Sequence, residues 1–220
     1  MEIKIVRQIL EWNEDKSNEI KALLSEKGVF MINVMGSPGA GKTSLIMVLM
    51  DALVGYRFGV VEGDVAGQVD AKKIAALGIP VAQINTDGAC HIEAMSIERI
   101  LPMFPLDEIE VIFVENIGNL VCPAEFNIGE DFRIAVLSIP EGDDKVEKYP
   151  LLFATSDVLV ISKFDMKPHF DFDEDVVEKK TRDINPHGKA FCVSSRDGTG
   201  IAELATHISA RINLKKHIGG

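Results

Sequence analysis

The stretch GSPGAGKT at residues 36–43 decides the fold, because it matches the pattern G-x-x-x-x-G-K-[ST] and directly follows an apolar run at residues 29–35. This pattern is the phosphate-binding P-loop. Its glycines let backbone N–H groups turn toward phosphate oxygens, while Lys42 reaches the β- and γ-phosphates and the Thr43 hydroxyl takes a Mg²⁺ position. The nucleotide contacts expected here are Gly36, Ser37, Gly39, Ala40, Gly41, Lys42, Thr43 and Ser44.

Segments typical of strands and helices alternate along the chain. Apolar runs predict strands at residues 29–35, 56–62, 79–84, 110–114, 132–139, 158–161 and 189–193. Helical spacing predicts helices at residues 43–53, 65–77, 90–101, 174–183 and 201–214, and one or two amphipathic helices at 5–27. This alternation predicts an α/β P-loop NTPase fold, a doubly wound and mostly parallel sheet with helices on both faces. We expect a single domain over residues 1–220, with residues 1–28 as a helical segment packed on it.

Composition restricts the partners. The chain has 34 acidic and 23 basic residues, for a net charge of −11. This balance argues against binding to nucleic acid or to an anionic membrane. No apolar run approaches the roughly 20 residues that span a bilayer, and the charged start lacks the apolar centre of a signal peptide. We therefore expect a cytoplasmic protein. Three cysteines are too few for a disulfide framework, so reduced thiols for chemistry or metal binding are expected.

Two acidic residues follow strands where Mg²⁺ and the γ-phosphate would lie. Asp64 comes directly after the strand at residues 56–62, and Glu115 follows the strand at 110–114. Both are candidate catalytic residues: Asp64 to hold Mg²⁺, and Glu115 to position Mg²⁺ or the attacking water. The backbone N–H of Gly118 could meet the γ-phosphate. The alternatives are an ordinary loop aspartate at 64 and a turn glycine with a capping glutamate at 115–118.

The sequence SKFD at residues 162–165 resembles the N-K-x-D signature of GTPases. In that signature the aspartate, here Asp165, accepts two hydrogen bonds from guanine, whereas adenine offers neither donor. The stem of Lys163 would lie over the base. Ser162 replaces the asparagine whose amide usually braces the P-loop, so we expect that brace to be lost. Ser194 and Ser195 follow the next strand, where GTPases supply a backbone N–H to guanine O6.

The order of these motifs resembles the HypB family of GTPases, which assist nickel insertion into hydrogenase. The resemblance rests on GSPGAGKTSL at residues 36–45, EGDVAGQVDAKKI at 62–74, QINTDGACHIEA at 83–94, FVENIGNLVCPAEFNIGE at 113–130 and SKFD at 162–165. The fourth segment is the most specific, because it joins the γ-phosphate switch to a Cys-Pro pair. The resemblance implies a SIMIBI-type GTPase that binds GTP and Mg²⁺, and Ni²⁺ or Zn²⁺ as cargo.

The family also implies partners and metal ligands. It implies a GTP-dependent homodimer with metal at the dimer interface, and handover to a HypA-type metallochaperone and the hydrogenase large subunit. The ligands carried over are Cys90, His91 and Cys122. The sequence lacks the N-terminal C-x-x-C-G-C motif and the histidine-rich tract of some members, so nickel storage is not carried over. The family often has Thr-Gly-Lys-Gly where residues 86–89 read TDGA.

Thiolate and imidazole ligands suit Zn²⁺ and can hold Ni²⁺. Cys90 and His91 are adjacent, however, and neighbours on a helix do not face the same side. A chelate within one chain is therefore awkward unless both lie at the frayed start of the helix, and a second subunit would solve the problem. The alternative is that Cys90 and Cys122 are small buried side chains and His91 a surface residue. Cys192, within a strand, is expected to be structural.

Two other function classes remain open. A P-loop small-molecule kinase would share the phosphate loop but would need a lid and an acceptor pocket. A nucleotide-gated metal-binding dimerisation module would hydrolyse little nucleotide. If the protein is a GTPase, its intrinsic rate should be low, because the sequence shows no arginine in a recognisable finger position and such a residue contributes about 10³ to 10⁵ in rate.

Overall fold

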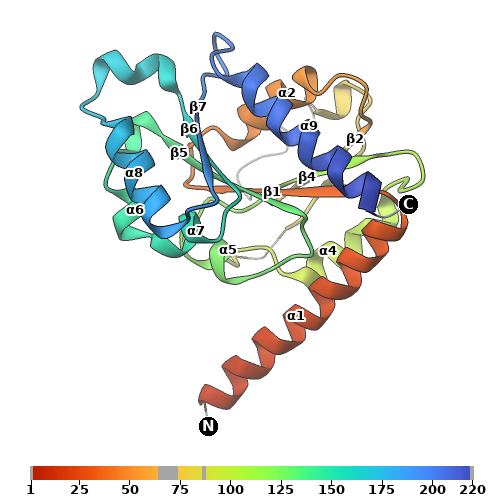
Figure 1. Cartoon of the computed structure of the whole chain (residues 1–220). Helices are drawn as coiled ribbons and strands as arrows, with labels where there is room; N and C mark the ends of the chain where they lie inside the picture. Colours follow the sequence, from red (N-terminus) through yellow and green to blue (C-terminus); the bar gives the residue numbers. More distant parts are fainter. Residues whose placement is uncertain (1, 64–73, 86–87, 219–220) are drawn as a thin grey trace.

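A parallel β-sheet forms the centre of the computed structural model, which describes residues 2–63, 74–85 and 88–218 (Figure 1). Within these residues the strand order is β3-β2-β4-β1-β5-β6-β7, and every pairing is parallel. The strands are β1 (Phe30–Gly36), β2 (Phe58–Glu62), β3 (Val81–Gln83), β4 (Val111–Glu115), β5 (Phe132–Ser138), β6 (Val158–Ser162) and β7 (Lys189–Cys192). The predicted doubly wound, parallel α/β fold is confirmed.

The register of the central strands brings the functional loops to one edge of the sheet. β1 lies between β4 and β5, with Val34 opposite both Glu115 and Ile134. The P-loop after β1 and the segment after β4 therefore begin at the same level. Since the chain crosses to β2 on one side of β1 and later to β5 on the other, this carboxyl edge contains the crevice where doubly wound folds bind ligands.

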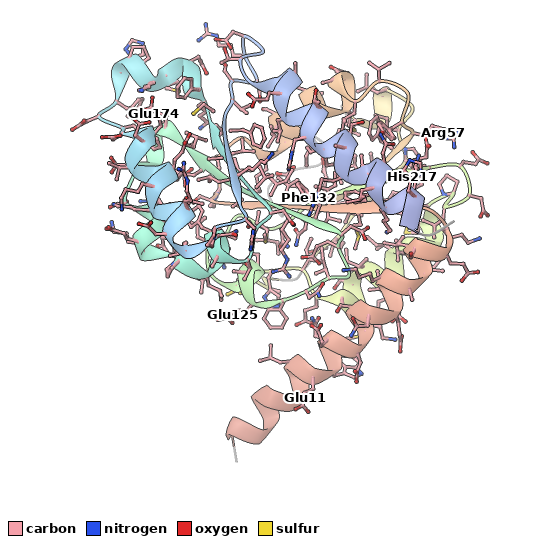
Figure 2. The ribbon with its side chains drawn as sticks, in the orientation of Figure 1. Glu11, Arg57, Glu125, Phe132, Glu174 and His217 are labelled. Atoms are coloured by element: carbon pink, nitrogen blue, oxygen red, sulfur yellow. The ribbon has the colours of Figure 1, made fainter. Side chains whose placement is uncertain are left out.

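Helices cover both faces of the sheet (Figure 1). The α-helices are α1 (Glu2–Glu26), α2 (Lys42–Ala52), α4 (Ala94–Ile100), α5 (Cys122–Glu125), α6 (Lys145–Lys148), α7 (Pro150–Ala154), α8 (Glu174–Ile184) and α9 (Ile201–Ile218). Short 3₁₀ turns occur at Leu101–Met103, Ile139–Glu141 and Phe164–His169. Helices α2 and α9 pack on one face, where Phe132 lies near the centre of the molecule (Figure 2). Helices α1 and α4 cover β1, β2 and β4 on the other face, and the short helices and α8 cover β5 and β6.

The N-terminal segment is one continuous helix, α1, where the sequence left one or two open. Its buried side chains Ile20 and Leu24 join the core on the α4 side of the sheet. The helix ends where Gly28 adopts a φ of +69°, a left-handed conformation that glycine adopts without a steric penalty. The opposite end, which includes Glu11, extends away from the sheet (Figure 2). Within the described residues, no helix combines the length and the apolar character that a membrane span requires.

Helix α4 differs from its prediction in a way that matters for function. It begins at Ala94 and not at Cys90, so residues 90–93 are not helical. Side chains from distant segments accept hydrogen bonds from backbone N–H groups here. The Ile92 N–H donates to Asn116 Oδ1 at 3.3 Å, and the N–H of Ala94, the first helical residue, donates to Asn13 Oδ1 at 3.0 Å. These tertiary bonds replace the first helical turn. Most of the helix predicted at 65–77 lies outside the described residues, and β3 is shorter than the predicted strand.

Candidate nucleotide and metal site

The P-loop curls between β1 and α2. Gly41, the N-cap of α2, has a φ of 94°, a conformation that a side chain would strain. The buried Lys42 ammonium donates to the carbonyl oxygens of Gly36 at 3.3 Å and Ser37 at 3.1 Å, so it lies inside the loop. The partial positive charge of the α2 N-terminus points into the same loop. The loop and this helix end together form a site for the phosphates of a nucleotide.

Oxygen ligands for a divalent cation lie next to the P-loop. Thr43 Oγ1 donates a hydrogen bond of 3.0 Å to Glu115 Oε1 at the end of β4, where Glu115 is buried. A hydroxyl and a carboxylate oxygen at this separation fit Mg²⁺, which prefers oxygen ligands and keeps several waters. The third predicted magnesium ligand, Asp64, lies outside the described residues.

The segment after β4 lies directly against the P-loop. A Cβ placed on Gly118 would be 2.7 Å from Pro38 Cγ and 2.8 Å from Pro38 N, so no other residue fits at this distance. The next residue, Asn119, donates its backbone N–H to the Gly36 carbonyl at 3.1 Å. Residues 115–119, which we call the switch segment, therefore touch both ends of the phosphate loop and would sense a γ-phosphate placed there.

A cavity of about 260 Å³ opens beside the P-loop and contains the predicted base-reading residues. Its lining is Ala40, Gly41, Ser44, Ser162, Lys163, Asp165, Met166, Ser195 and Arg196. Within it, Asp165 Oδ1 accepts a 2.9 Å hydrogen bond from the hydroxyl of Ser194, which is fully buried. Ser194 therefore orients the carboxylate, while Ser195 lines the cavity itself. Arg196, the residue after Ser195, has its Nη1 atom 3.9 Å from Asp165 Oδ2.

The SKFD segment is tied to the P-loop by two side chains. Ser162 Oγ donates to the Ala40 carbonyl at 2.6 Å, so the brace that the sequence led us to expect lost is present. Lys163 Nζ donates to the Gly39 carbonyl at 2.6 Å. Lys163 has a φ of 56°, the one positive value at a non-glycine among the described residues, which costs about 1 to 2 kcal/mol. A strained backbone held by surrounding contacts is a feature of ligand sites.

The three predicted metal ligands come together in one chain. Ligand atoms of Cys90, His91 and Cys122 all lie within 4.8 Å of one another, and Cys90 Sγ is 3.5 Å from His91 Nδ1. The expected difficulty with adjacent ligands on a helix does not arise, because Cys90 and His91 precede α4. A chelate within one chain is therefore geometrically available, which is the alternative that the sequence left open.

The donor atoms of this triad suit a borderline-soft metal ion such as Zn²⁺ or Ni²⁺. The neighbouring Cys122 thiol and burial raise the pKa of Cys90. Burial lowers the pKa of His91 against the opposing effect of Glu93 and Glu125, and the latter lies at the end of α5 (Figure 2). The His91 ring stacks on Phe126 with centroids 3.9 Å apart. A neutral imidazole fixed by stacking and two thiols that lose protons on metal binding form a set that Zn²⁺ or Ni²⁺ would accept.

Asparagine side chains that the sequence did not single out hold the ligand loops. Asn119 Nδ2 donates to the Cys90 carbonyl at 3.2 Å, and Asn119 Oδ1 accepts from the Val121 N–H at 2.8 Å. Asn119 thus links the P-loop, through its backbone N–H, to both cysteine segments, through its side chain. On the α1 side, Asn13 accepts from Ala94 and donates to the Asn127 carbonyl at 2.7 Å. Local sequence patterns do not reveal these links, because the partners in three of the four bonds lie 29, 81 and 114 positions away.

The third cysteine lies outside the triad. Cys192 is at the end of β7, half-buried beside the side chains that cover β5 and β6. Burial raises its pKa to about 11. The thiol is therefore protonated at neutral pH, and its structural role stays a prediction.

Comparison with known proteins identifies the family. The model of the CobW/HypB/UreG nucleotide-binding domain matches residues 30–192. The chain is 39% identical over 207 residues to the hydrogenase/urease maturation factor HypB of Helicobacter pylori, covering 92% of this chain and 85% of that protein. This chain belongs to the HypB family. The family predicted from the motifs is confirmed.

Solved structures of HypB proteins share the fold of this HypB-family chain. The crystal structure of HypB from Helicobacter pylori in complex with nickel matches with a TM-score of 0.86 at 36% identity, covering 91% of this chain and 95% of that one. HypB from Archaeoglobus fulgidus matches with a TM-score of 0.85 at 29% identity, covering 92% and 99%. The fold is that of the SIMIBI-type P-loop GTPases, as predicted.

Proposed function

We propose that this HypB-family chain is a cytoplasmic GTP-hydrolysing metallochaperone that assists nickel insertion during [NiFe]-hydrogenase maturation, as a single GTPase domain over residues 1–220. The observation that carries the proposal is the path of one segment. Residues 115–122 begin at the carboxylate that contacts Thr43, lie against the P-loop at Gly118, and end at the thiol of Cys122. A phosphate site and a soft-metal site are therefore parts of one continuous stretch.

The nucleotide chemistry follows from the residues around the P-loop. Lys42 neutralises the β- and γ-phosphates, and Thr43, Glu115 and Asp64 hold Mg²⁺, which offsets charge on the phosphate oxygens. Glu115 also positions the attacking water, and the Gly118 N–H meets the γ-phosphate. Water attacks the γ-phosphorus while the bond to the β–γ bridging oxygen breaks, leaving GDP and phosphate. Asp165 selects guanine by accepting its N1–H and amine hydrogens, with Lys163 over the base.

The cargo chemistry follows from the triad. Cys90, His91 and Cys122 hold Ni²⁺ or Zn²⁺, a proposal supported by the relative that crystallised in complex with nickel. GTP binding forms or tightens a homodimer in which the two triads lie at the interface. Hydrolysis then releases the ion toward a HypA-type metallochaperone and the hydrogenase large subunit. By linkage, metal tightens the GTP-bound state by the same factor that GTP tightens metal binding.

The test combines Ni²⁺ titration with mass measurement in solution, using GDP and a non-hydrolysable GTP analogue. We expect different Ni²⁺ affinities in the two states and a heavier species with the analogue. Cys122→Ala should erase the difference and leave nucleotide affinity nearly intact, while Cys192→Ala, the matched cysteine control, should keep it. Equal Ni²⁺ affinities in both wild-type states would show that release is not gated by nucleotide, and a monomer under all conditions would remove the interface site.

Three measurements test the nucleotide site and separate the alternatives. Lys42→Ala should abolish nucleotide binding or turnover, because it removes the ammonium inside the P-loop. Phosphate release in a single turnover distinguishes a GTPase from a nucleotide-gated dimerisation module, which would bind GTP without releasing phosphate. Faster turnover with ATP and an acceptor than with GTP would instead identify a small-molecule kinase.

A further inference from the structure

A fully buried asparagine lies in the middle of the central strand. Asn33 of β1 has no exposed surface, and its neighbours along the strand are apolar core residues. Burying an amide in such a strand is unfavourable unless every polar atom is paired. Both ends of the side chain are paired: Asn33 Nδ2 donates to Glu130 Oε1 at 3.2 Å, and Asn33 Oδ1 accepts from Asn116 Nδ2 at 3.1 Å. The side chain therefore joins two segments that lie on either side of β1.

One of these segments, at Asn116, contacts the turn that carries the first two metal ligands. Asn116 is fully buried, and its Oδ1 accepts the N–H of Ile92 at 3.3 Å and of Ile117 at 2.9 Å. Ile92 directly follows His91, so this bond sets where the Cys90-His91 turn leaves the core. Asn116 also directly follows Glu115, the carboxylate that contacts Thr43 beside the P-loop. A displacement of Glu115 by nucleotide and Mg²⁺ must therefore reach Ile92 through one residue.

The other segment, at Glu130, is linked through Arg133 to the helix that carries the third ligand. Glu130, which is buried, accepts the Ile128 N–H at 2.7 Å and forms a salt bridge with Arg133 of β5. The Arg133 guanidinium donates to the carbonyl oxygens of Ala124 at 3.5 Å and Phe126 at 3.4 Å. Ala124 is in α5 together with Cys122, and the Phe126 ring stacks on His91. This end of the network therefore fixes α5 and the surface on which the imidazole rests.

We propose that the linked side chains Asn116, Asn33, Glu130 and Arg133, which we call the buried polar relay, position the metal triad and transmit the nucleotide state to it. The inference rests on the proposed function and adds the residues that connect its two sites. The relay holds the Cys90-His91 turn at one end and α5 at the other, so the separation of the thiols depends on it. Because its buried donors and acceptors are paired across three segments, a shift of Asn116 breaks a bond or moves the whole network.

The experiment uses the full chain, two relay variants and one matched control. Asn33→Leu removes both bonds of the central residue at similar volume. Asn116→Asp keeps the acceptor for Ile92 and Ile117 but loses the donor to Asn33, and it decides the question if Asn33→Leu fails to fold. The control is Asn185→Ala, which removes bonds to the carbonyl oxygens of Phe153 and Ser156 at the opposite edge of the sheet.

Each protein is titrated with Ni²⁺ in the GDP state and with a non-hydrolysable GTP analogue, and the thiolate-to-nickel absorption band reports ligation. We expect the relay variants to bind Ni²⁺ about 10- to 100-fold more weakly, the usual effect of removing residues that orient metal ligands. We also expect the ratio of Ni²⁺ affinities between the two nucleotide states to approach one, while Asn33→Leu, which lies outside the nucleotide site, keeps its GDP affinity nearly unchanged. Asn185→Ala should lower the thermal midpoint while keeping the wild-type ratio and absorption band.

The outcomes separate this inference from the proposed function. If the wild type shows a nucleotide-dependent Ni²⁺ affinity and both relay variants keep that ratio and that affinity, the relay is overturned and the proposed function stands. If the control loses the ratio as the relay variants do, the effect is general destabilisation and the relay is overturned. If the wild type itself binds Ni²⁺ equally in the GDP state and with the GTP analogue, nucleotide gating and transmission by the relay are both overturned.

Discussion

The hydroxyl of Ser162 at the end of β6 donates a hydrogen bond of 2.6 Å to the carbonyl oxygen of Ala40 in the P-loop, 122 residues earlier. Both residues are buried, so the bond is shielded from competing water. In the GTPase signature N-K-x-D, the amide of the asparagine braces the P-loop. In this chain the shorter side chain of Ser162 makes that contact. The SKFD segment and the P-loop are held together at the wall of the cavity that Asp165 lines.

Replacing Ser162 by alanine should weaken nucleotide binding. The substitution leaves the buried Ala40 carbonyl unpaired, which costs about 1 to 3 kcal/mol of stability. It also frees the P-loop from β6, so GDP affinity measured by calorimetry should fall. The control is Ser156→Ala, whose buried hydroxyl donates to the Leu152 carbonyl at 2.7 Å away from the nucleotide site. A loss of GDP affinity in the control equal to that in Ser162→Ala would contradict a specific brace.

Replacing Gly118 by alanine should uncouple the switch segment from the P-loop. The added Cβ would lie 2.7 to 2.9 Å from three atoms of Pro38, two of them backbone, so one segment must move. Single-turnover phosphate release should slow much more than GDP affinity falls, because the N–H that we propose to meet the γ-phosphate is displaced. Gly59→Ala introduces a comparable clash, with the ring of Phe104 at 2.8 Å, but far from the phosphate loop. Equal turnover in the two variants would show that the close approach of Gly118 is only packing.

Replacing Asp165 by asparagine should change base preference. Asparagine keeps an oxygen for the Ser194 hydroxyl, so the side chain should stay in place. It offers a donor where guanine also presents one, and the loss of a charge-assisted pair should lower GTP affinity about 10- to 100-fold. Xanthosine triphosphate, which has an oxygen in place of the guanine amine, should bind the variant better than the wild type. Competition curves that do not change would show that SKFD is not the base reader.

His207 of α9 should make stability depend on pH. The centroid of its ring lies 6.1 Å from that of Phe132 and 5.5 Å from that of Phe191. Burial lowers the pKa of His207, and the positive charges of Lys189 and Arg211 lower it further. Because the pKa is lower in the folded state, the unfolded chain binds the proton at a higher pH than the folded chain does. Stability is therefore fully present above the unfolded pKa of about 6.5 and is lost as pH falls through it toward the folded value.

Urea denaturation at about pH 7.5 and about pH 5.5 measures this loss. His207→Phe should lose less stability between the two conditions than the wild type, because all other titrating groups are shared. His169→Phe, at an exposed site, is the control and should follow the wild type. An identical acid-side loss in His207→Phe and the wild type would rule out a contribution from this ring.

The sequence determined what depends on local pattern and residue chemistry. The apolar runs predicted the parallel strands, GSPGAGKT predicted the phosphate loop, and the segment FVENIGNLVCPAEFNIGE predicted a switch joined to a cysteine. These features need only neighbours in the chain or residue types with one strong chemistry. The family followed from the same motifs, because their order and spacing are read directly from the sequence.

Only the tertiary structure decided how the sites are held. Cys90 and His91 were predicted within a helix, yet α4 begins at Ala94 because Asn13 and Asn116 take the backbone donors of this stretch. The brace from Ser162 and the central bond between Asn33 and Asn116 join residues 122 and 83 positions apart. A hydrogen bond depends on distance and direction in space, and the strand order, with β4 inserted between β2 and β1, brings these partners together. The local sequence does not record where a side chain lies in the folded chain. An asparagine in a strand therefore looks the same whether it faces solvent or bonds two distant segments.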